Sequence, residues 1–334
     1  MKTFNLICWI LLFVSFCVGA GFYSEITLYA RQPLDGRNIE KKLDIAFGEQ
    51  FETTLDHLTA SGMVRNPLKF RFYAKFKGYD QKIKAGEYLI STRMSPEELL
   101  MNMVSGKVVL YRFTIPEGYS LAQIADVIVR NGWGTRDDFL NLTKDPEFIH
   151  SLGMDAQTLE GYLYPETYFF PKGAELKKII SAMINRFNKV YTPQWKTRAE
   201  ELGLSIHQVV TLASIIEKET GNASERPVIA SVFHNRLNKK MRLESDPTVI
   251  YGIPNFNGDI TKKDLMTVTP YNTYKISGLP PGPIASPGAK SLEAALYPAQ
   301  TPFLFFVSKN NGSHQFSRTM EEHEQAVRQY QLSR

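Results

Sequence analysis

Apolar residues in the middle of the chain recur with the period of an amphipathic helix. Val209, Leu212 and Ile216 fall at i, i+3 and i+7, a spacing that gathers side chains on one helical face. The same stripe places Glu219 beside Ile216, where a polar residue is not expected. Glu217 lies about 100° from Ile216, on the flank of that face. The pattern therefore predicts a helix with one carboxylate at the end of its apolar side.

The residues after this helix predict a loop-rich region. Ser224 is the expected N-cap of a second helix that turns Val228, Ile229, Val232 and Phe233 inward. Beyond it the chain predicts a turn and strand over 239–243, a tight turn over 246–248, a proline-rich loop over 277–288, a hairpin over 303–317 and a closing helix over 319–332. The proline-rich loop is a candidate wall for a sugar chain. His323, in the closing helix, is expected to face solvent.

A strand, a glycine turn and a helix recur three times before residue 134. The predicted strands span 43–48, 83–90 and 113–118, and the predicted helices span 51–58, 95–104 and 120–129. Ser95 and Glu98 have the spacing of a capping box. Residues 70–77 mix aromatic and basic side chains, which favours packing, with contact to a glycan as the alternative. Further helices are expected over 136–149, 175–190 and 193–202.

The N-terminus predicts a membrane segment. Leu6–Tyr23 is almost wholly apolar and is about as long as a helix needs to be to cross a bilayer. A cleaved signal peptide is the alternative, because Val18-Gly19-Ala20 has the small residues of a cleavage site. We favour a retained anchor because the run is long for a signal core. Lys2 and the terminal amine favour a cytoplasmic N-terminus, which places the body outside the inner membrane.

Composition excludes several classes of protein. The formal net charge of the 334 residues is +5 and the basic residues are scattered, which argues against a nucleic-acid partner. Both cysteines, Cys8 and Cys17, lie in the apolar N-terminal run, so the rest of the chain has no disulfide or thiolate chemistry. The sequence has no H-E-x-x-H motif and its six histidines are dispersed, so we expect neither a metal nor another cofactor.

The carboxylate on the apolar stripe has two interpretations. Burial raises a carboxyl pKa because the charged form loses its hydration, and a neutral Glu219 is then a general acid. Alternatively, Glu219 faces solvent at the helix end or pairs with Lys218 or Arg226. Structural acids outnumber catalytic ones, so the stripe alone does not decide between the two.

Two groups of motifs resemble known families. Ile115–Ala125, I-P-E-G-Y-S-L-A-Q-I-A, resembles LysM modules, which implies binding of N-acetylglucosamine-containing glycans; a purely structural α+β region is the alternative. The second group is E-K-E-T at 217–220, A-S-E-R at 223–226, V-I-A-S-V-F-H-N-R-L at 228–237, M-R-L-E-S-D-P-T-V-I-Y-G at 241–252, Y-N-T-Y at 271–274 and G-L-P-P-G-P-I-A-S-P-G at 278–288. This combination is similar to the endolytic murein transglycosylase (YceG-like) family. His234 departs from the more usual V-F-I-N pattern.

The second resemblance implies an enzyme anchored in the inner membrane that cuts nascent peptidoglycan strands internally. The family's catalytic acid is the second Glu of E-K-E-T, which falls on Glu219. It would protonate the oxygen between N-acetylmuramic acid and N-acetylglucosamine and then take the proton of the muramyl C6 hydroxyl, which closes a 1,6-anhydro end without water. Association with peptidoglycan synthases is implied as well, as is the ending of nascent strand growth.

Other residues are expected to support the positive charge that develops on the sugar. The substrate-binding candidates are Glu225, Asn235, Asp246, Asn272 and Tyr274. One alternative is a muramidase that uses Glu219 with a second carboxylate, Glu225 or Asp246. Another is a non-catalytic scaffold that binds peptidoglycan.

The predicted fold is α+β. Its expected domains are a cytoplasmic start and transmembrane anchor over 1–25, a linker over 26–37, a small LysM-like α+β region over 38–133 and a larger mixed α+β catalytic domain over 134–334. The expected topology is single-pass with a periplasmic catalytic domain.

Overall fold

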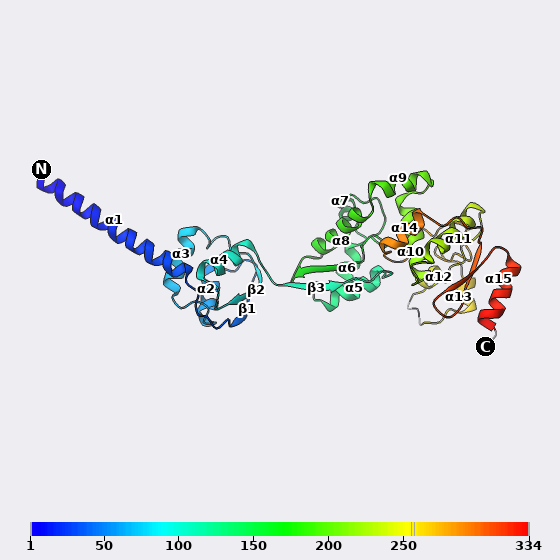
Figure 1. The fold of residues 1–334 in the computed structure, drawn as a ribbon, viewed down its shortest axis with the longest axis horizontal. Coiled ribbons are helices and arrows are strands. Elements are labelled where there is room, and N and C mark those ends of the chain that lie inside the picture. The colour runs from blue at the N-terminus through cyan, green and yellow to red at the C-terminus, as the bar shows by residue number, and fades with distance from the viewer. Residues whose placement is uncertain (1, 255, 257, 333–334) are drawn as a thin grey trace. The chain divides into compact units, whose positions relative to one another are not determined.

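The computed structural model is a mixed α+β structure and describes residues 2–254, 256 and 258–332 (Figure 1). Met1, part of the predicted cytoplasmic start, and residues 333–334, the end of the predicted catalytic domain, lie outside the described residues. The chain forms two compact units. One runs to Tyr111 and includes Phe169–Gly173, and the other comprises Arg112–Tyr168 and the chain from Ala174 onward. The predicted α+β class is confirmed, while the LysM-like character and the domain boundaries stay predictions.

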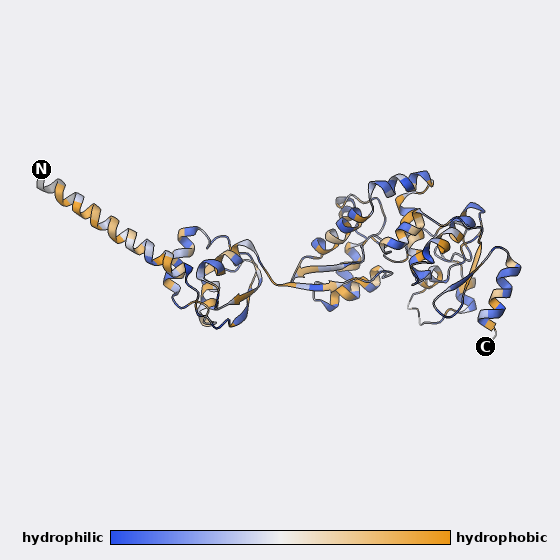
Figure 2. Ribbon diagram, in the orientation of Figure 1, coloured by the Kyte–Doolittle hydropathy of each residue, from blue (hydrophilic) through white to orange (hydrophobic). Residues whose placement is uncertain are grey.

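The first helix, α1 (Lys2–Arg31), is continuous. Its segment Trp9–Arg31 is long and apolar enough to cross a membrane, a test that a signal sequence also passes. Figure 2 shows the predominantly hydrophobic colouring along this helix. Its last turns belong to the first unit, since Ile26 and Ala30 are buried in that unit's core. The helix thus continues into the residues predicted as a linker.

After α1, the first unit contains a two-stranded sheet and three helices. β1 (Glu40–Ile45) pairs antiparallel with β2 (Gly86–Ser91), so that Leu43 lies opposite Tyr88. The helices are α2 (Phe51–Ala60), α3 (Pro67–Lys77) and α4 (Pro96–Ser105). The predicted capping box at the start of α4 is confirmed, with Ser95 and Glu98 bonding reciprocally. The prediction that the aromatic side chains of residues 70–77 pack is confirmed for Phe70 and Tyr73 of α3, which are buried.

The second unit is mostly helical. The elements between α4 and the central helix are β3 (Leu110–Thr114), α5 (Leu121–Arg130), α6 (Arg136–Leu142), α7 (Pro146–Ser151), β4 (Thr167–Pro171), α8 (Leu176–Val190) and α9 (Pro193–Glu201). Two of them belong partly to the first unit: β3 as far as Tyr111, and β4 from Phe169 onward. The elements after the central helix are α11 (Arg226–Asn238), α12 (Asp246–Tyr251), α13 (Lys262–Met266), α14 (Ala289–Leu296), the hairpin β5 (Phe305–Ser308) and β6 (His314–Ser317), α15 (Met320–Val327) and the π-helical turn η1 (Arg328–Leu332).

The central helix of this unit is α10 (Ile206–Glu219). It begins three residues before Val209, the first residue of the predicted stripe, because Ser205 forms a capping box with Gln208. All eight residues of Val209–Ile216 are buried. Helices α9, α11, α12 and α14 pack against it, so α10 carries the core of the unit.

The proline-rich loop lies along α10 and is bonded to it at three points. His207 Nε2 donates to the Pro281 carbonyl over 2.8 Å. The N–H of Ile284 donates to Ser214 Oγ over 3.0 Å, and the N–H of Gly288 donates to Glu217 Oε2 over 2.9 Å. Residues 282–288 are all buried. The prediction that this loop is a wall for a sugar chain is therefore wrong over residues 282–288, because they pack inside the unit.

Two predicted elements after α10 differ in the structure. Residues 239–243 form no strand, because the carbonyls of Arg242 and Leu243 accept hydrogen bonds from the Arg236 guanidinium in place of a neighbouring strand. Residues 246–248 are the first turn of α12 and not an isolated tight turn, with Pro247 at a position that needs no N–H donor.

Two further predictions about helices differ in the structure. The helix expected over 136–149 is divided in two, because Asp145 caps a new helix at Pro146. Ser224 caps no helix; its hydroxyl donates to Asn222, and α11 begins after Glu225 without a side-chain cap. The predicted hairpin and closing helix are confirmed.

Candidate active site

Glu219 is the last residue of α10 and is partly buried. The next residue, Thr220, has an extended backbone with φ −145° and ψ 135°, which ends the helix. The stripe of apolar residues that leads to Glu219 is buried. The structure therefore places this carboxylate where the helical period predicts it, at the end of the buried side.

Two cavities adjoin Glu219. Their volumes are about 300 Å³ and about 440 Å³, and Glu219, Asp246 and Phe306 line both. The smaller cavity is also lined by Arg236, Tyr274 and His323, and the larger by Thr220, Ser308 and His314. The carboxyl group thus stands at the junction of two hollows formed by α10, α11, α12, the C-terminal hairpin and α15.

The pKa of Glu219 is raised to about 7. Burial is the largest cause, since the charged carboxylate loses hydration, and the negative charge of Asp246 adds to the effect. A hydrogen bond from Ser245 and the positive charge of Arg236 oppose it. Near neutral pH the group therefore exists in both protonation states.

Ser245 determines which oxygen of Glu219 can carry the proton. Its hydroxyl donates to Oε1 of Glu219, while its own N–H donates to Thr273 Oγ1 over 2.9 Å. Ser245 is buried and holds the start of α12 against the end of α10. Because Oε1 accepts this bond, the proton of the neutral acid is placed on Oε2.

Asp246 and Tyr274, two of the substrate-binding candidates, lie together beside Glu219. The Tyr274 hydroxyl donates to Asp246 Oδ1 over 2.7 Å, and both residues line the smaller cavity. Burial raises the pKa of Tyr274, and the Asp246 carboxylate raises it further, so the phenol stays protonated as a donor. The pair places a hydrogen-bonded carboxylate next to Glu219.

Arg236 forms another wall of the smaller cavity. Its guanidinium donates to the Leu304 carbonyl over 2.7 Å and pairs with Glu244 over 3.1 Å. It also lies over the Phe305 ring, 5.1 Å from the centroid. One side chain thus joins α11, the segment before α12 and strand β5, which fixes the hollow next to Glu219.

The other three candidates have their polar atoms engaged by the protein. Glu225 accepts from the backbone N–H of His314 and pairs with the His314 ring over 2.7 Å. The Asn235 amide donates to the carbonyls of Thr301 and Phe303. Asn272 is buried, and its amide donates to three carbonyls at residues 264–267. His314 brings Glu225 to the edge of the larger cavity, whereas Asn235 and Asn272 hold backbone segments.

Glu217 belongs to a different contact from Glu219. Its side chain is 5% exposed and pairs with Arg226 over 2.8 Å, while its second oxygen accepts the N–H of Gly288. Glu117 lies 3.7 Å from the same guanidinium. Glu217 is therefore a buried residue that joins α10, α11 and the proline-rich loop.

A second carboxyl, Glu160, also has its pKa raised to about 7 by burial. Its Oε1 accepts the N–H of Leu121 over 3.0 Å, and its Oε2 accepts the Tyr251 hydroxyl over 3.0 Å. Both oxygens thus hold the start of α5 and the end of α12. This carboxyl differs from Glu219, which stands beside two hollows.

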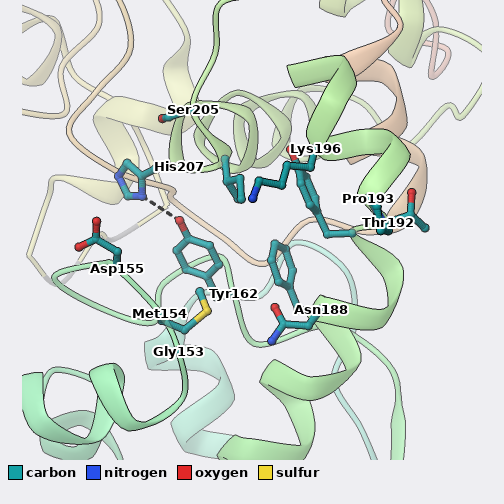
Figure 3. Close-up of a pocket in the computed structure, with 13 residues that line it drawn as sticks. Gly153, Met154, Asp155, Tyr162, Asn188, Thr192, Pro193, Lys196, Ser205 and His207 are labelled. Atoms are coloured by element: carbon teal, nitrogen blue, oxygen red, sulfur yellow. Dashed lines mark hydrogen bonds between the residues drawn. The ribbon is translucent and has the colours of Figure 1, made fainter. Parts of the chain in front are cut away.

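A larger pocket of about 760 Å³ lies at the opposite end of α10 (Figure 3). Tyr162, Phe187 and Tyr191 line it, and Figure 3 shows the Tyr162 hydroxyl directed at His207, to which it donates over 2.9 Å. The first and last turns of α10 are about 20 Å apart at 1.5 Å per residue. This pocket is therefore remote from Glu219.

Comparison with known proteins agrees with the motifs around α10. The sequence profile of the YceG-like family matches residues 43–329. The chain belongs to this family. A curated relative from Bacillus subtilis, named endolytic murein transglycosylase, is 34% identical over 86% of this chain and 84% of its own length.

Further relatives of this YceG-like protein include one from Streptococcus pneumoniae with the same name, 29% identical over 96% of the chain; the chain spans 64% of that protein's length. The crystal structure of a yceG-like protein from Listeria monocytogenes superposes with a TM-score of 0.60 at 36% identity. The superposition covers 86% of this chain and 98% of the Listeria chain.

The sequence interpretation of this YceG-like protein missed His323. The ring lines the smaller cavity and stacks on Phe305 at 5.2 Å, and its Nδ1 is buried without a hydrogen-bond partner. Burial lowers its pKa, and the charge of Arg236 adds to this. The prediction of a solvated histidine is therefore wrong, because the flanking acids gave no sign that β5 covers one face of the ring. Among the described residues, no cluster of His, Cys, Asp and Glu could hold a metal ion.

Proposed function

We propose that this chain is an endolytic lytic transglycosylase that cuts peptidoglycan between N-acetylmuramic acid and N-acetylglucosamine. The names of its relatives in Bacillus and Streptococcus support the substrate class. The observation that carries the proposal is the position of Glu219, with a pKa of about 7, at the junction of two cavities. A carboxyl that titrates near the working pH can give a proton and take one back.

In the first step, the neutral Glu219 donates its Oε2 proton to the glycosidic oxygen. The bond from that oxygen to muramyl C1 breaks, the N-acetylglucosamine part leaves as an alcohol, and positive charge develops at C1. The Asp246 carboxylate, held by Tyr274, stabilises this charge because it lies beside Glu219 in a partly desolvated hollow.

In the second step, Glu219 acts as a base. Its carboxylate takes the proton of the muramyl C6 hydroxyl, and the C6 oxygen forms a bond to C1 of the same sugar. The product is a 1,6-anhydro end, no water is consumed, and Glu219 is again neutral. One carboxyl suffices, since the proton that it loses in the first step returns in the second.

The two-carboxylate muramidase remains the second candidate because Asp246 adjoins Glu219. In that mechanism Asp246 would activate water or attack C1, and the new end would be a reducing sugar. The same geometry thus leads to two distinguishable products.

We further propose that α1 is a retained single-pass anchor, with the N-terminus in the cytoplasm and both units outside the cytoplasmic membrane. The continuity of this helix from its apolar segment into the core of the first unit supports retention. From this position the enzyme would cut strands as they are synthesised and end their growth, with peptidoglycan synthases as partners.

The test is digestion of purified peptidoglycan by the full chain and by Glu219→Gln, with products identified by mass spectrometry. We expect 1,6-anhydromuramyl ends from the wild type and a rate lower by at least about 10²-fold for the variant. Full activity of Glu219→Gln would overturn the site. Reducing ends from the wild type would establish the muramidase. Absence of cleavage together with co-sedimentation of the chain with peptidoglycan would overturn both enzymes in favour of the scaffold.

Thermal unfolding controls for the integrity of the variant. The pKa of Glu219 is about 7 in the fold and about 4.3 in an unfolded chain, so its ionisation costs stability progressively between these values and the cost persists above pH 7. Glutamine removes that cost. Glu219→Gln is therefore expected to melt at or above the wild-type temperature at pH 8 and with the wild type at pH 4.

A further inference from the structure

Helix α3 presents three large apolar side chains on its outer face. Leu68, Phe72 and Phe76 are 61%, 53% and 64% exposed. They stand four residues apart, which places them within an arc of about 80°. The opposite side of the helix is buried, with Phe70 and Ala74 in the core of the first unit. A contiguous apolar row of this kind on a folded protein indicates a surface that contacts something other than water.

Lysines flank this apolar row on both sides. Lys69 and Lys75 lie about 60° to either side of Phe72 on the helix. Lys69 pairs with Glu25 of α1, and the ammonium of Lys75 lies 3.8 Å from Glu52 and is more than half exposed. An apolar row bordered by lysines is typical of helices that lie in the plane of a membrane surface, because the long lysine stems reach the headgroups while the row enters the acyl boundary.

The apolar row adjoins Phe22 and Tyr23, the last two residues of the apolar run Leu6–Tyr23 in α1. The Phe72 ring meets Phe22 edge-on at 5.6 Å, and the Phe76 ring meets Tyr23 at 5.4 Å. Aromatic side chains at the end of a spanning segment concentrate at the headgroup level. The row of α3 and the aromatic end of α1 therefore lie at the same depth.

The depth of α3 is fixed by the fold of the first unit. Ile26 and Ala30, one and two turns beyond Phe22 and Tyr23 on the same helix, are buried in the core to which α3 contributes Phe70. A helix that is continuous from the apolar segment into this core cannot place its aromatic end at a membrane surface without bringing α3 there as well.

We propose that α3 is an interfacial helix, with Leu68, Phe72 and Phe76 inserted in a lipid bilayer and Lys69 and Lys75 in contact with anionic headgroups. The proposal rests on the proposed membrane anchoring by α1. It assigns the first unit a second membrane contact, which holds that unit against the bilayer in one orientation.

The test uses the full chain in vesicles of phosphatidylethanolamine and phosphatidylglycerol. A fluorescent nitrobenzoxadiazole label is attached to Phe76→Cys, and separately to Phe72→Cys, after Cys8 and Cys17 are replaced by serine. Quenching by lipids that carry a nitroxide at two acyl depths locates each label. We expect blue-shifted emission and a depth of about 5–10 Å into the boundary between headgroups and acyl chains.

Phe47→Cys is the matched control. Phe47 is 99% exposed and belongs to the same unit, in the turn between β1 and α2. Its label is expected to keep the emission of an aqueous probe. A label on the native Cys17, with Cys8 replaced, reports separately whether α1 lies in the bilayer.

The outcomes separate the two proposals. One outcome is that the label at position 17 is quenched, while the labels at 72 and 76 are quenched no more than the label at 47. This result would leave the anchor in place and overturn the interfacial helix. Absence of quenching at position 17 would overturn the anchor and with it the interfacial helix. In vesicles of phosphatidylcholine alone, quenching at 76 is expected to fall; equal quenching would overturn the role of the lysines.

Discussion

The hydroxyl of Ser245 donates a hydrogen bond to Oε1 of Glu219, across 26 residues of sequence. This bond favours the carboxylate, so it holds the pKa of Glu219 lower than burial alone would. In Ser245→Ala the pKa rises above about 7, and the neutral acid persists to higher pH. We expect the alkaline limb of the pH–rate profile to move up by roughly one unit.

Glu160→Gln is the control for this assignment, because Glu160 is the other carboxyl with a pKa of about 7. Its replacement is expected to leave the limb in place. If the alkaline limb of the pH–rate profile moves in Glu160→Gln and stays in place in Ser245→Ala, the limb reports the ionisation of Glu160 and not that of Glu219.

The charge of Asp246 acts on Glu219 in the opposite sense. The negative charge raises the pKa of Glu219, so Asp246→Asn lowers it and moves the alkaline limb down by roughly one unit. The rate also falls, because the developing charge at C1 loses its carboxylate. The products of the residual activity distinguish the transglycosylase from the two-carboxylate muramidase. Anhydromuramyl ends are expected, whereas reducing ends that disappear in Asp246→Asn would assign Asp246 the role of base or nucleophile.

Gly161 is expected to tolerate no side chain. Its φ is +82°, and an added Cβ would lie 2.4 Å from Cβ of Pro283 in the proline-rich loop. Gly161→Ala is expected to lower the free energy of unfolding by about 3 kcal/mol, through backbone strain and overpacking. At Gly203, φ is +69° and nothing lies within 4 Å, so Gly203→Ala carries only the backbone cost, about 1 kcal/mol. If urea denaturation gives the same loss of unfolding free energy for both variants, Pro283 moves aside to accommodate the added Cβ.

The buried pair of Glu217 and Arg226 is expected to contribute to stability and not to chemistry. Glu217→Gln removes the nearer carboxylate from a buried guanidinium and leaves only the more distant and more exposed Glu117, which costs about 3 kcal/mol of unfolding free energy. Glu201 pairs with Arg198 on the surface, and Glu201→Gln is expected to change stability by less than about 1 kcal/mol. Chemical denaturation measures both. A large loss of turnover in a fully folded Glu217→Gln would assign that carboxylate a role in the reaction.

Local chemistry explains which parts of the fold the sequence predicts. The stripe from Val209 to Ile216 repeats within about two helical turns, so the helix and the side on which Glu219 lies follow from the period alone. Ser95 and Glu98 meet over three residues, and their capping box was equally predictable. The prediction at Ser224 failed because its hydroxyl bonds Asn222 locally in place of a helix N-terminus.

The environment of the acid depends on long-range contacts that no local pattern contains. The Arg236 guanidinium donates hydrogen bonds to the carbonyls of residues 242, 243 and 304. These bonds replace those of the predicted strand and shape the smaller cavity. His323 reaches the same cavity from the closing helix. Asp246 and Tyr274 were predicted through the family motifs, and their mutual hydrogen bond follows only from the folded chain.

The proline-rich loop has a consequence for how this chain can vary in evolution. Pro281, Ile284 and Gly288 are hydrogen-bonded to three positions spread along α10, from its first turn to its last. The spacing of these positions on the helix therefore sets how many loop residues fit between the first bond and the last. An insertion or deletion between Pro281 and Gly288 would move at least one of these hydrogen-bonding groups away from its partner on α10. Natural variants of this segment are therefore expected to differ by replacement and to keep its length.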